Sequence, residues 1–417
     1  MVVFRYTALE GPIAWGYYSR KEIVNAKPRI LFVCHAATRN GATILLLNTL
    51  RWLRENSDIE IEILVHGGGD LLHEFKAIGR TTVLRNAAFF LEAFPHGMRA
   101  SLKPKVESLW LNLLMMGRKF DLVYLNTSAV AADVPGLASR AKRMLWHIHE
   151  LKYALQLTMG EAMIRDLFPR MDRFVAVSNA VQDTLRSFGV PQDKMDMVRG
   201  SVPVNEFTSD DRCVRRRKVL AQLGWPEDAF VVGACGGMGW RKGTDLFLQI
   251  ARQIRNGVNG DKFRFLWVGG AVKGEEALRF DHDVRLFGLA KQCCSIPTTG
   301  NVMDYYKAMN VFALTSREDP FPLVMLEAGA CHVPTVCFAE SGGGPEYVGD
   351  DAGLIAPYLD VAAFAMHLET LRSSIEIRSR MGDAAAGKVR AGHVVETQGP
   401  KILASIRKTL AVGGGKG

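Results

Sequence analysis

The chain has 417 residues, of which 48% are apolar and 23% are charged. That length suits two domains of roughly 200 residues each, and the composition is that of a globular protein. Collagen-like, repetitive and largely disordered classes are excluded by the same numbers. No run of about 18 apolar residues occurs, so we expect no membrane-spanning helix.

Positive charge is concentrated in the first half of the chain. The net charge is +9, and residues 1–205 hold 26 Lys and Arg against 19 Asp and Glu. A basic face is usually only solvated, but it suits an acidic partner such as an anionic membrane or a phosphate-bearing acceptor. No motif for nucleic acid accompanies the charge, so we expect no such partner. The apolar segment 109–116 predicts a packed helix, with membrane contact as the alternative.

Cysteine usage and the N-terminus indicate a cytoplasmic protein. The seven cysteines are scattered, and the adjacent Cys293 and Cys294 suit neither a disulfide framework nor a zinc site. Residues 1–28 lack the basic-then-apolar pattern of a signal peptide and are interpreted as an extension. Peripheral contact with the inner face of the plasma membrane is left open.

From residue 29 the chain alternates between short apolar runs and helical patterns. The run 29–34 is continuous and apolar, as expected of a strand buried on both faces. A polar loop with Asn40 and Gly41 follows, and then a helix with leucines on one side. Strands alternating with helices indicate a parallel sheet. Further strands are expected at 60–66, 122–126, 144–149 and 174–178.

The series pauses near residue 205 and then restarts. Pro203 and the charged run 210–218 are interpreted as the linker and the opening of a second domain. A strand at 230–235, a glycine-rich loop and a helix at 244–255 come next. Later elements are expected at 263–268, 311–316, 335–338 and, as a final helix, 401–410, before a tail from Gly413 that we expect to be disordered. The expected division is an extension, two α/β domains and a last helix, at 1–28, 29–205, 206–395 and 396–412.

The loop 236–243 is the strongest site signal and reads Gly-Gly-Met-Gly-Trp-Arg-Lys-Gly. It lies between a buried strand and a helix, where backbone N–H groups and the positive helix end favour anions. Glycines such as Gly237 and Gly243 allow close approach of the backbone, and Arg241 and Lys242 add positive charge. The spacing fits neither a P-loop nor a dinucleotide fingerprint. Taken alone, the loop is equally consistent with phosphate binding and with a tight connection.

Two more polar turns follow strands of the second domain. Segment 315–328 is stiffened by Pro322 and starts a helix near Leu323. Ligands collect at the carboxyl ends of strands in open α/β folds, so this helix start could meet a phosphate. Glu327, one turn in, could bind sugar hydroxyls or could simply be solvated. The third turn, 341–346, reads Ser-Gly-Gly-Gly-Pro-Glu, and three such turns at one sheet edge indicate a binding site.

With these motifs, the second domain resembles the donor domain of retaining glycosyltransferases of the GT-B fold, specifically glycosyltransferase family 4. The resemblance covers residues 29–395 and is most specific over 230–350. The matching positions are Lys242 and Gly243 for the loop that holds the donor diphosphate, Asp319 and Glu327 for the family's pair of acids, and Gly342, Gly343, Pro345 and Glu346 for its glycine-rich turn.

The first domain fits the family less specifically. Segment 35–43 resembles the loop that faces the donor phosphates, with Gly41 as the matching glycine. Segment 147–150 resembles a strand ending in His and an acid, with His149 as the better match. The implied fold is α/β, with two Rossmann-like parallel-sheet domains facing a central cleft and a last helix that crosses back to the first domain.

Two positions depart from the family pattern. Members usually carry Arg directly after the first glycine of the phosphate loop, where this chain has Gly237. Arg241 is the candidate replacement for that charge. The first acid of the pair is usually Glu, whereas here it is Asp319, with Glu318 one residue out of spacing.

The resemblance implies hexosyl transfer from a UDP- or GDP-sugar to a saccharide or lipid-linked acceptor, with retention of configuration, in bacterial polysaccharide or glycolipid synthesis. Fixed cations and N–H donors would stabilise the departing diphosphate, and no metal or cofactor is expected. Glu327 would bind the ribose, Asp319 the donor hydroxyls and His149 the transferred sugar. Two alternatives stay open: an epimerase of sugar nucleotides with the GT-B fold, and a non-catalytic relative that binds nucleotide sugar.

Overall fold

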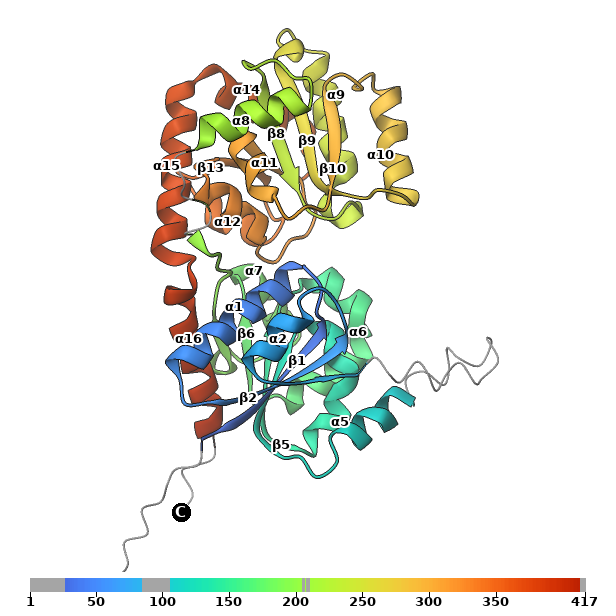
Figure 1. The fold of residues 1–417 in the computed structure, drawn as a ribbon, viewed down its shortest axis with the longest axis vertical. Helices are drawn as coiled ribbons and strands as arrows, with labels where there is room; N and C mark the ends of the chain where they lie inside the picture. Colours follow the sequence, from blue (N-terminus) through green and yellow to red (C-terminus); the bar gives the residue numbers. More distant parts are fainter. Residues whose placement is uncertain (1–26, 85–105, 205–206, 208–210, 413–417) are drawn as a thin grey trace, which may run out of the picture.

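The computed structural model of the chain describes residues 27–84, 106–204, 207 and 211–412. Two parallel sheets, each covered by helices, follow one another along the long axis of the molecule (Figure 1). The predicted extension 1–28 lies almost wholly outside the described residues, and so does the tail from Gly413.

The first sheet has the strand order β3-β2-β1-β4-β5-β6-β7, and all its pairs are parallel. Residues 30–34 of the central strand β1 are fully buried, as their unbroken apolar run predicts for a strand covered on both faces. The strands are β1 (Arg29–Ala36), β2 (Glu60–Gly67), β3 (Arg80–Val83), β4 (Phe120–Asn126), β5 (Ala141–Ile148), β6 (Arg173–Ala176) and β7 (Met195–Met197). The α-helices of this part are α1 (Gly41–Asn56), α2 (Leu72–Ile78), α5 (Val134–Ala138), α6 (Lys152–Leu167) and α7 (Asn179–Ser187).

The second sheet has the order β10-β9-β8-β11-β12-β13 and is also parallel. Its core includes Trp267 and Phe247, whose rings meet edge to face at 5.3 Å. The strands are β8 (Phe230–Cys235), β9 (Phe263–Gly270), β10 (Cys293–Pro297), β11 (Val311–Leu314), β12 (Thr335–Phe338) and β13 (Gly353–Ala356). The helices are α8 (Arg212–Gln222), α9 (Thr244–Arg255), α10 (Glu275–Leu286), α11 (Val302–Ala308), α12 (Leu323–Ala330), α13 (Gly343–Val348), α14 (Val361–Ser373), α15 (Ile375–Gly392) and α16 (Val395–Ala411).

The last helix packs on the first domain although it follows the second in sequence. Helices α15 and α16 run in line along one side of both sheets, drawn in red in Figure 1. Ser405 of α16 donates a hydrogen bond of 2.8 Å to Asp196 of β7. A Cβ on Gly399 would lie 2.4 Å from the Trp52 ring of α1, so only glycine permits this close approach.

The sequence reading differs from the structure mainly at short elements. Strands β3, β7, β10 and β13 were not predicted, since each has five residues or fewer and little alternation. Most of the charged run 210–218 is helix α8 rather than linker. Its Arg212 and Arg216 donate to the carbonyls of Met309 and Ala229, which holds this helix against the second domain.

Candidate functional site

Loops that follow the strands of the two sheets meet between the domains. Gly41, at the start of α1, lies opposite Leu323, at the start of α12; a Cβ on this glycine would be 3.9 Å from the leucine side chain. The Tyr153 N–H of α6 donates to the Glu318 carboxylate at 3.1 Å. The two carboxyl edges therefore face one another.

The three glycine-rich or polar turns of the second domain come together at one edge, as predicted. Gly243 has φ +67°, and a Cβ there would lie 2.0 Å from the Thr315 carbonyl oxygen. The Arg317 N–H donates to the Arg241 carbonyl, so the first and second turns are joined. Asp319 pairs with Gly342 in an isolated parallel bridge, which joins the second turn to the third. Backbone contacts thus fix all three turns.

Lys242 and Asp319 form an ion pair at the centre of these turns. The Lys242 ammonium lies 2.5 Å from Asp319 Oδ2, which also accepts a bond of 3.1 Å from the Ser316 hydroxyl. The Asp319 carboxylate is nearly buried, with 7% of its side chain exposed. The Lys242 stem also lies close to Gly236. Lys242, the predicted cation, therefore lies at the phosphate loop, and Asp319, the predicted sugar-binding acid, forms an ion pair with it.

Arg241 extends beside this pair. Its guanidinium donates to the Glu318 carbonyl at 2.9 Å and lies 3.9 Å from Asp319 Oδ1. Gly237, where the family arginine would stand, is exposed, and a Cβ there would meet nothing within 4 Å. Two cations face one nearly buried carboxylate, so the loop keeps positive charge for an anionic ligand.

Glu327 lies one turn into α12 and is half-buried. The buried Tyr306 of α11 donates a hydrogen bond of 2.6 Å to Glu327 Oε2. Burial raises the pKa of the Tyr306 hydroxyl well above its usual value, so this group stays a donor. The contact with Tyr306 could not be predicted from sequence, because the tyrosine lies in another helix.

Pro322 and Leu323 form the start of α12. Pro322 is the N-cap, and its side chain makes no capping hydrogen bond to the first N–H groups of this helix. Leu323 is 9% exposed and packs toward Gly200 of the first domain. The N–H groups at this helix start thus lie where the two domains meet.

A polar cluster stands at the facing edge of the first sheet. His149 Nε2 lies 3.0 Å from Asn126 Oδ1, and its ring is 4.1 Å from that of His147. Burial lowers the pKa of His149 to about 3, so the ring is neutral near pH 7. Tyr124 and His147 share a hydrogen bond of 2.6 Å. His149, predicted as a site residue, is therefore a neutral imidazole held within this cluster.

Four further residues lie at this edge: His35 and Glu150 belong to the two segments that resemble the family, whereas His66 and Asp133 were not singled out from the sequence. His66 contacts Asp133 in an ion pair or hydrogen bond, and His35 has a buried Nδ1 with no partner among the described residues. Glu150 accepts bonds from the N–H groups of Ser128 and His149, and burial raises its pKa to about 7. Polar residues at the ends of successive strands were the available signal.

Glu346 of the third turn spans the two domains. It accepts a bond of 2.9 Å from the Asn179 N–H, at the start of α7, and one of 2.8 Å from Arg199. Tyr153 and Trp240 make a second contact across the domains, with ring centroids 5.1 Å apart. The structure thus places Glu346 in a contact between domains rather than free beside the phosphate loop.

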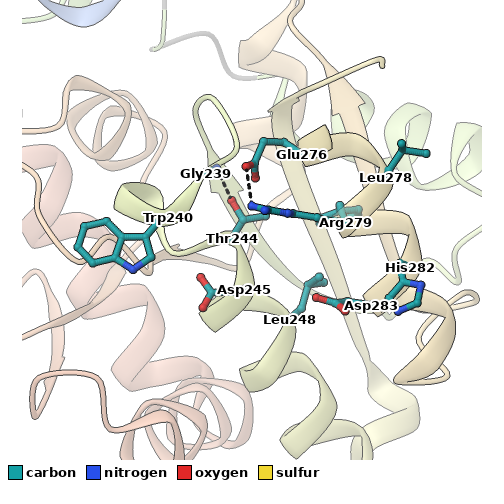
Figure 2. A pocket seen from close by; sticks show the side chains of 11 residues that line it. Gly239, Trp240, Thr244, Asp245, Leu248, Glu276, Leu278, Arg279, His282 and Asp283 are labelled. Carbon is teal, nitrogen blue, oxygen red and sulfur yellow. Dashed lines mark hydrogen bonds and ion pairs between the residues drawn. The ribbon is translucent and has the colours of Figure 1, made fainter. Parts of the chain in front are cut away.

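A cavity of about 540 Å³ adjoins the other side of the phosphate loop (Figure 2). It lies between α9 and α10 and begins at Gly239 and Trp240. Asp245, one of its lining residues, makes a paired contact with Arg317 at 2.8 and 2.7 Å. All of its lining residues belong to the second domain, so this cavity is distinct from the edge that faces His149.

The comparisons with known proteins agree with this arrangement. The sequence pattern of the family described as Glycosyl transferases group 1 matches residues 215–388, and that of Glycosyltransferase Family 4 matches residues 39–206. The chain belongs to glycosyltransferase family 4. Both domains of this family member are accounted for by the two matches.

The curated relatives of this family 4 member share part of its length. It is 28% identical over 256 residues to D-inositol 3-phosphate glycosyltransferase 1 of Catenulispora acidiphila, covering 59% of each chain. It is 22% identical over 209 residues to the alpha-galactosylglucosyldiacylglycerol synthase of Streptococcus pneumoniae, covering 47% of this chain and 54% of that protein. The chain thus spans little more than half the length of these relatives.

Solved structures show that the fold is GT-B. Anabaena HepE in complex with UDP-glucose superposes with a TM-score of 0.75 at 18% identity, over 91% of this chain and 100% of that one. Sucrose-phosphate synthase from Thermosynechococcus elongatus gives 0.75 at 16% identity, over 93% and 100%. The predicted pair of Rossmann-like parallel-sheet domains is confirmed. No helix within the described ranges combines the length and apolar character that a bilayer crossing requires.

Proposed function

We propose that this family 4 member transfers a hexosyl group from a nucleotide sugar to a saccharide or lipid-linked acceptor, with retention of configuration. The observation that carries the proposal is the loop of Lys242 and Arg241 set opposite the edge that bears His149. One edge offers cations and N–H donors suited to a diphosphate, and the other offers neutral polar groups suited to sugar hydroxyls.

In the proposed reaction the bond between the sugar's C1 and the diphosphate oxygen breaks while the acceptor oxygen bonds to C1 on the same face. The acceptor's proton passes to the departing diphosphate, so no protein nucleophile is required. Lys242, Arg241 and the N–H groups at Leu323 would stabilise the charge that develops on the diphosphate. Glu327 would bind the ribose, with Tyr306 fixing the orientation of its carboxylate.

Asp319 and His149 would act on the sugar that moves. Asp319 holds Lys242 in place and has a second oxygen available toward Arg241. His149 is neutral near pH 7 and donates its Nε2–H to the Asn126 amide oxygen, which leaves Nδ1 to accept one hydrogen bond from a sugar hydroxyl without adding charge. The meeting of the domains would exclude water, which protects the donor from hydrolysis.

The acceptor class is proposed from the relatives and from the charge of the chain. One relative is named for an inositol phosphate and another for a diacylglycerol glycolipid, and the solved HepE complexes contain UDP or UDP-glucose. A UDP-sugar donor and a saccharide or glycolipid acceptor of a bacterial cell surface fit these relatives and the basic first half of the chain. Peripheral contact with an anionic membrane is part of this proposal.

A thermal-shift screen of UDP-, GDP- and ADP-sugars tests the donor class, because a ligand of the folded state raises the melting temperature. Nucleoside diphosphate release is then measured with and without a panel of acceptors. Acceptor-dependent release supports transfer. Binding without turnover on any acceptor would favour a non-catalytic protein, and acceptor-independent conversion of the sugar would favour an epimerase.

A further inference from the structure

A second cavity, of about 290 Å³, lies at the opposite edge of the second sheet from the candidate site. It is bounded by the beginnings of β8 and β11 and by residues of α8 and of the α14–α15 region. The candidate site uses the carboxyl ends of the same strands, so the two sites are separated by the length of the sheet. Figure 1 places α8 and α14 at the end of the second domain farthest from the first.

Positive charge dominates the lining of this cavity. Four of its eight lining residues are cationic, and Asp228 is the one carboxylate among them. The cations are Arg216, Lys262, Arg372 and Arg378. They come from three separate segments of the chain, with Arg372 and Arg378 on either side of the α14–α15 junction, so the fold, not a local run of basic residues, brings them together.

Carboxylate partners account for little of this charge. Arg372 is paired with Glu369, whereas Arg216, Lys262 and Arg378 have no ion pair in the part of the chain that the structure describes. Arg216 and Arg378 donate to backbone carbonyls, including those of Ala229 and Leu371. Such bonds anchor the two arginines but neutralise no charge.

The cationic side chains also repel one another. Burial, and then the neighbouring Arg212 and Arg378, lower the pKa of Arg216 from its usual value. Burial, and then Arg212, lower the pKa of Arg378 in the same way. A cluster in which like charges are partly desolvated and unneutralised is stabilised by a bound anion.

We propose that this cavity binds a phosphate dianion, either inorganic phosphate or the terminal group of a soluble phosphomonoester. Arginine forks and a lysine converging on one small polar cavity match the several acceptor oxygens of such a group. Arg216 and Arg378 are held in position by their bonds to carbonyls. Lys262 is exposed, its ammonium has no hydrogen-bond partner among the described residues, and it completes the site. The inference does not depend on the glycosyl-transfer proposal.

The test is calorimetry with inorganic phosphate at constant ionic strength, on a chain carrying Lys242→Ala so that the candidate donor site is weakened. We expect one phosphate to bind per chain. Adding Lys262→Glu should weaken binding about tenfold or more, because it replaces a charge-assisted contact by repulsion. Lys76→Glu, at an exposed lysine of α2 in the first domain, makes the same change of net charge and should have no effect.

Asp228→Asn provides a test in the opposite direction. It removes the one carboxylate of the lining and should tighten phosphate binding several-fold. Lys262, Lys76 and Asp228 are all exposed, so the circular dichroism and melting temperature of each variant should match those of the Lys242→Ala parent. Absence of phosphate binding, or equal binding by the Lys262→Glu and Lys76→Glu chains, would overturn the proposal. The proposal would also fail if the chain bound phosphatidylglycerol vesicles through Lys262 but did not bind inorganic phosphate. The phosphate recognised would then belong to a lipid headgroup.

Discussion

Replacing Lys242 by Ala tests the phosphate loop, and the structure predicts two separable effects. Asp319, with 7% of its side chain exposed, would keep only the Ser316 hydroxyl and a distant guanidinium as partners. Removing one member of a buried ion pair costs about 3–5 kcal/mol, and the partial exposure of Lys242 together with the remaining bond reduces this to about 2 kcal/mol. Lys242→Ala should therefore lower the free energy of unfolding by about that amount.

Loss of the ammonium should also weaken donor binding. A charge-assisted contact to a diphosphate is worth about 1.5–3 kcal/mol, which corresponds to roughly tenfold or more in affinity. Urea unfolding gives the stability term, and calorimetry with UDP or GDP gives the affinity term.

The double variant Lys242→Ala/Asp319→Asn separates the two effects. It leaves no buried charge without a partner, so most of the stability should return while nucleotide binding stays weak. Lys291→Ala, at an exposed lysine of the same domain, is the matched control. Wild-type nucleotide affinity in the double variant would refute the assignment of Lys242 to the diphosphate.

Four further predictions concern the same site. Gly237→Arg restores the residue usual in the family, at a position with open space around it and a backbone φ that other residues adopt, so nucleotide affinity measured by calorimetry should rise or stay equal. A large loss of affinity would show that the loop closes over this position. Glu327→Gln should mainly raise the donor KM in steady-state kinetics, because ribose contacts act in both ground and transition states, and an unchanged KM would contradict that role. Asp319→Glu should depress kcat, since the added methylene must fit a nearly buried position whose backbone pairs with Gly342. Wild-type rates for both this variant and Asp319→Ala would place Asp319 outside the site, and Glu318 would become the acid to test. Activity should survive excess EDTA, since Lys242 and Arg241 supply the cations, and a loss restored by Mg²⁺ or Mn²⁺ would reveal a metal site.

Local pattern predicted the repeated architecture well. Strand β8, helix α9 and strand β12 have the bounds that the apolar periodicity gave, because each is a buried, strongly patterned element flanked by glycine or polar turns. The unpredicted strands β3, β7, β10 and β13 lie at the edges of the sheets and are partly exposed, so no run of buried residues marks them in the sequence. The charged run 210–218 does open the second domain, but most of it is helix rather than linker, because its arginines donate to carbonyls of that domain, a role that sequence spacing does not display.

Residues of the candidate site were predictable where they stand in a local sequence motif. Lys242, Gly243 and Glu327 stand in motifs with a physical reason for each residue type. The Tyr306 bond to Glu327 and the pairing of Lys242 with Asp319 join residues far apart in the chain, so only the fold reveals them. The contacts of Glu346 with Asn179 and Arg199 of the other domain are likewise visible only in the fold, and its role in donor binding stays a prediction.

The most direct test of the central claim is to follow the sugar from donor to product. With the nucleotide sugar selected by the thermal-shift screen and an accepted acceptor, nuclear magnetic resonance would give the amount and anomeric configuration of the product while nucleoside diphosphate release is counted. The account predicts one transferred sugar for each nucleoside diphosphate released, with the configuration of the donor retained. Release without a glycosylated product, or a product of inverted configuration, would contradict it.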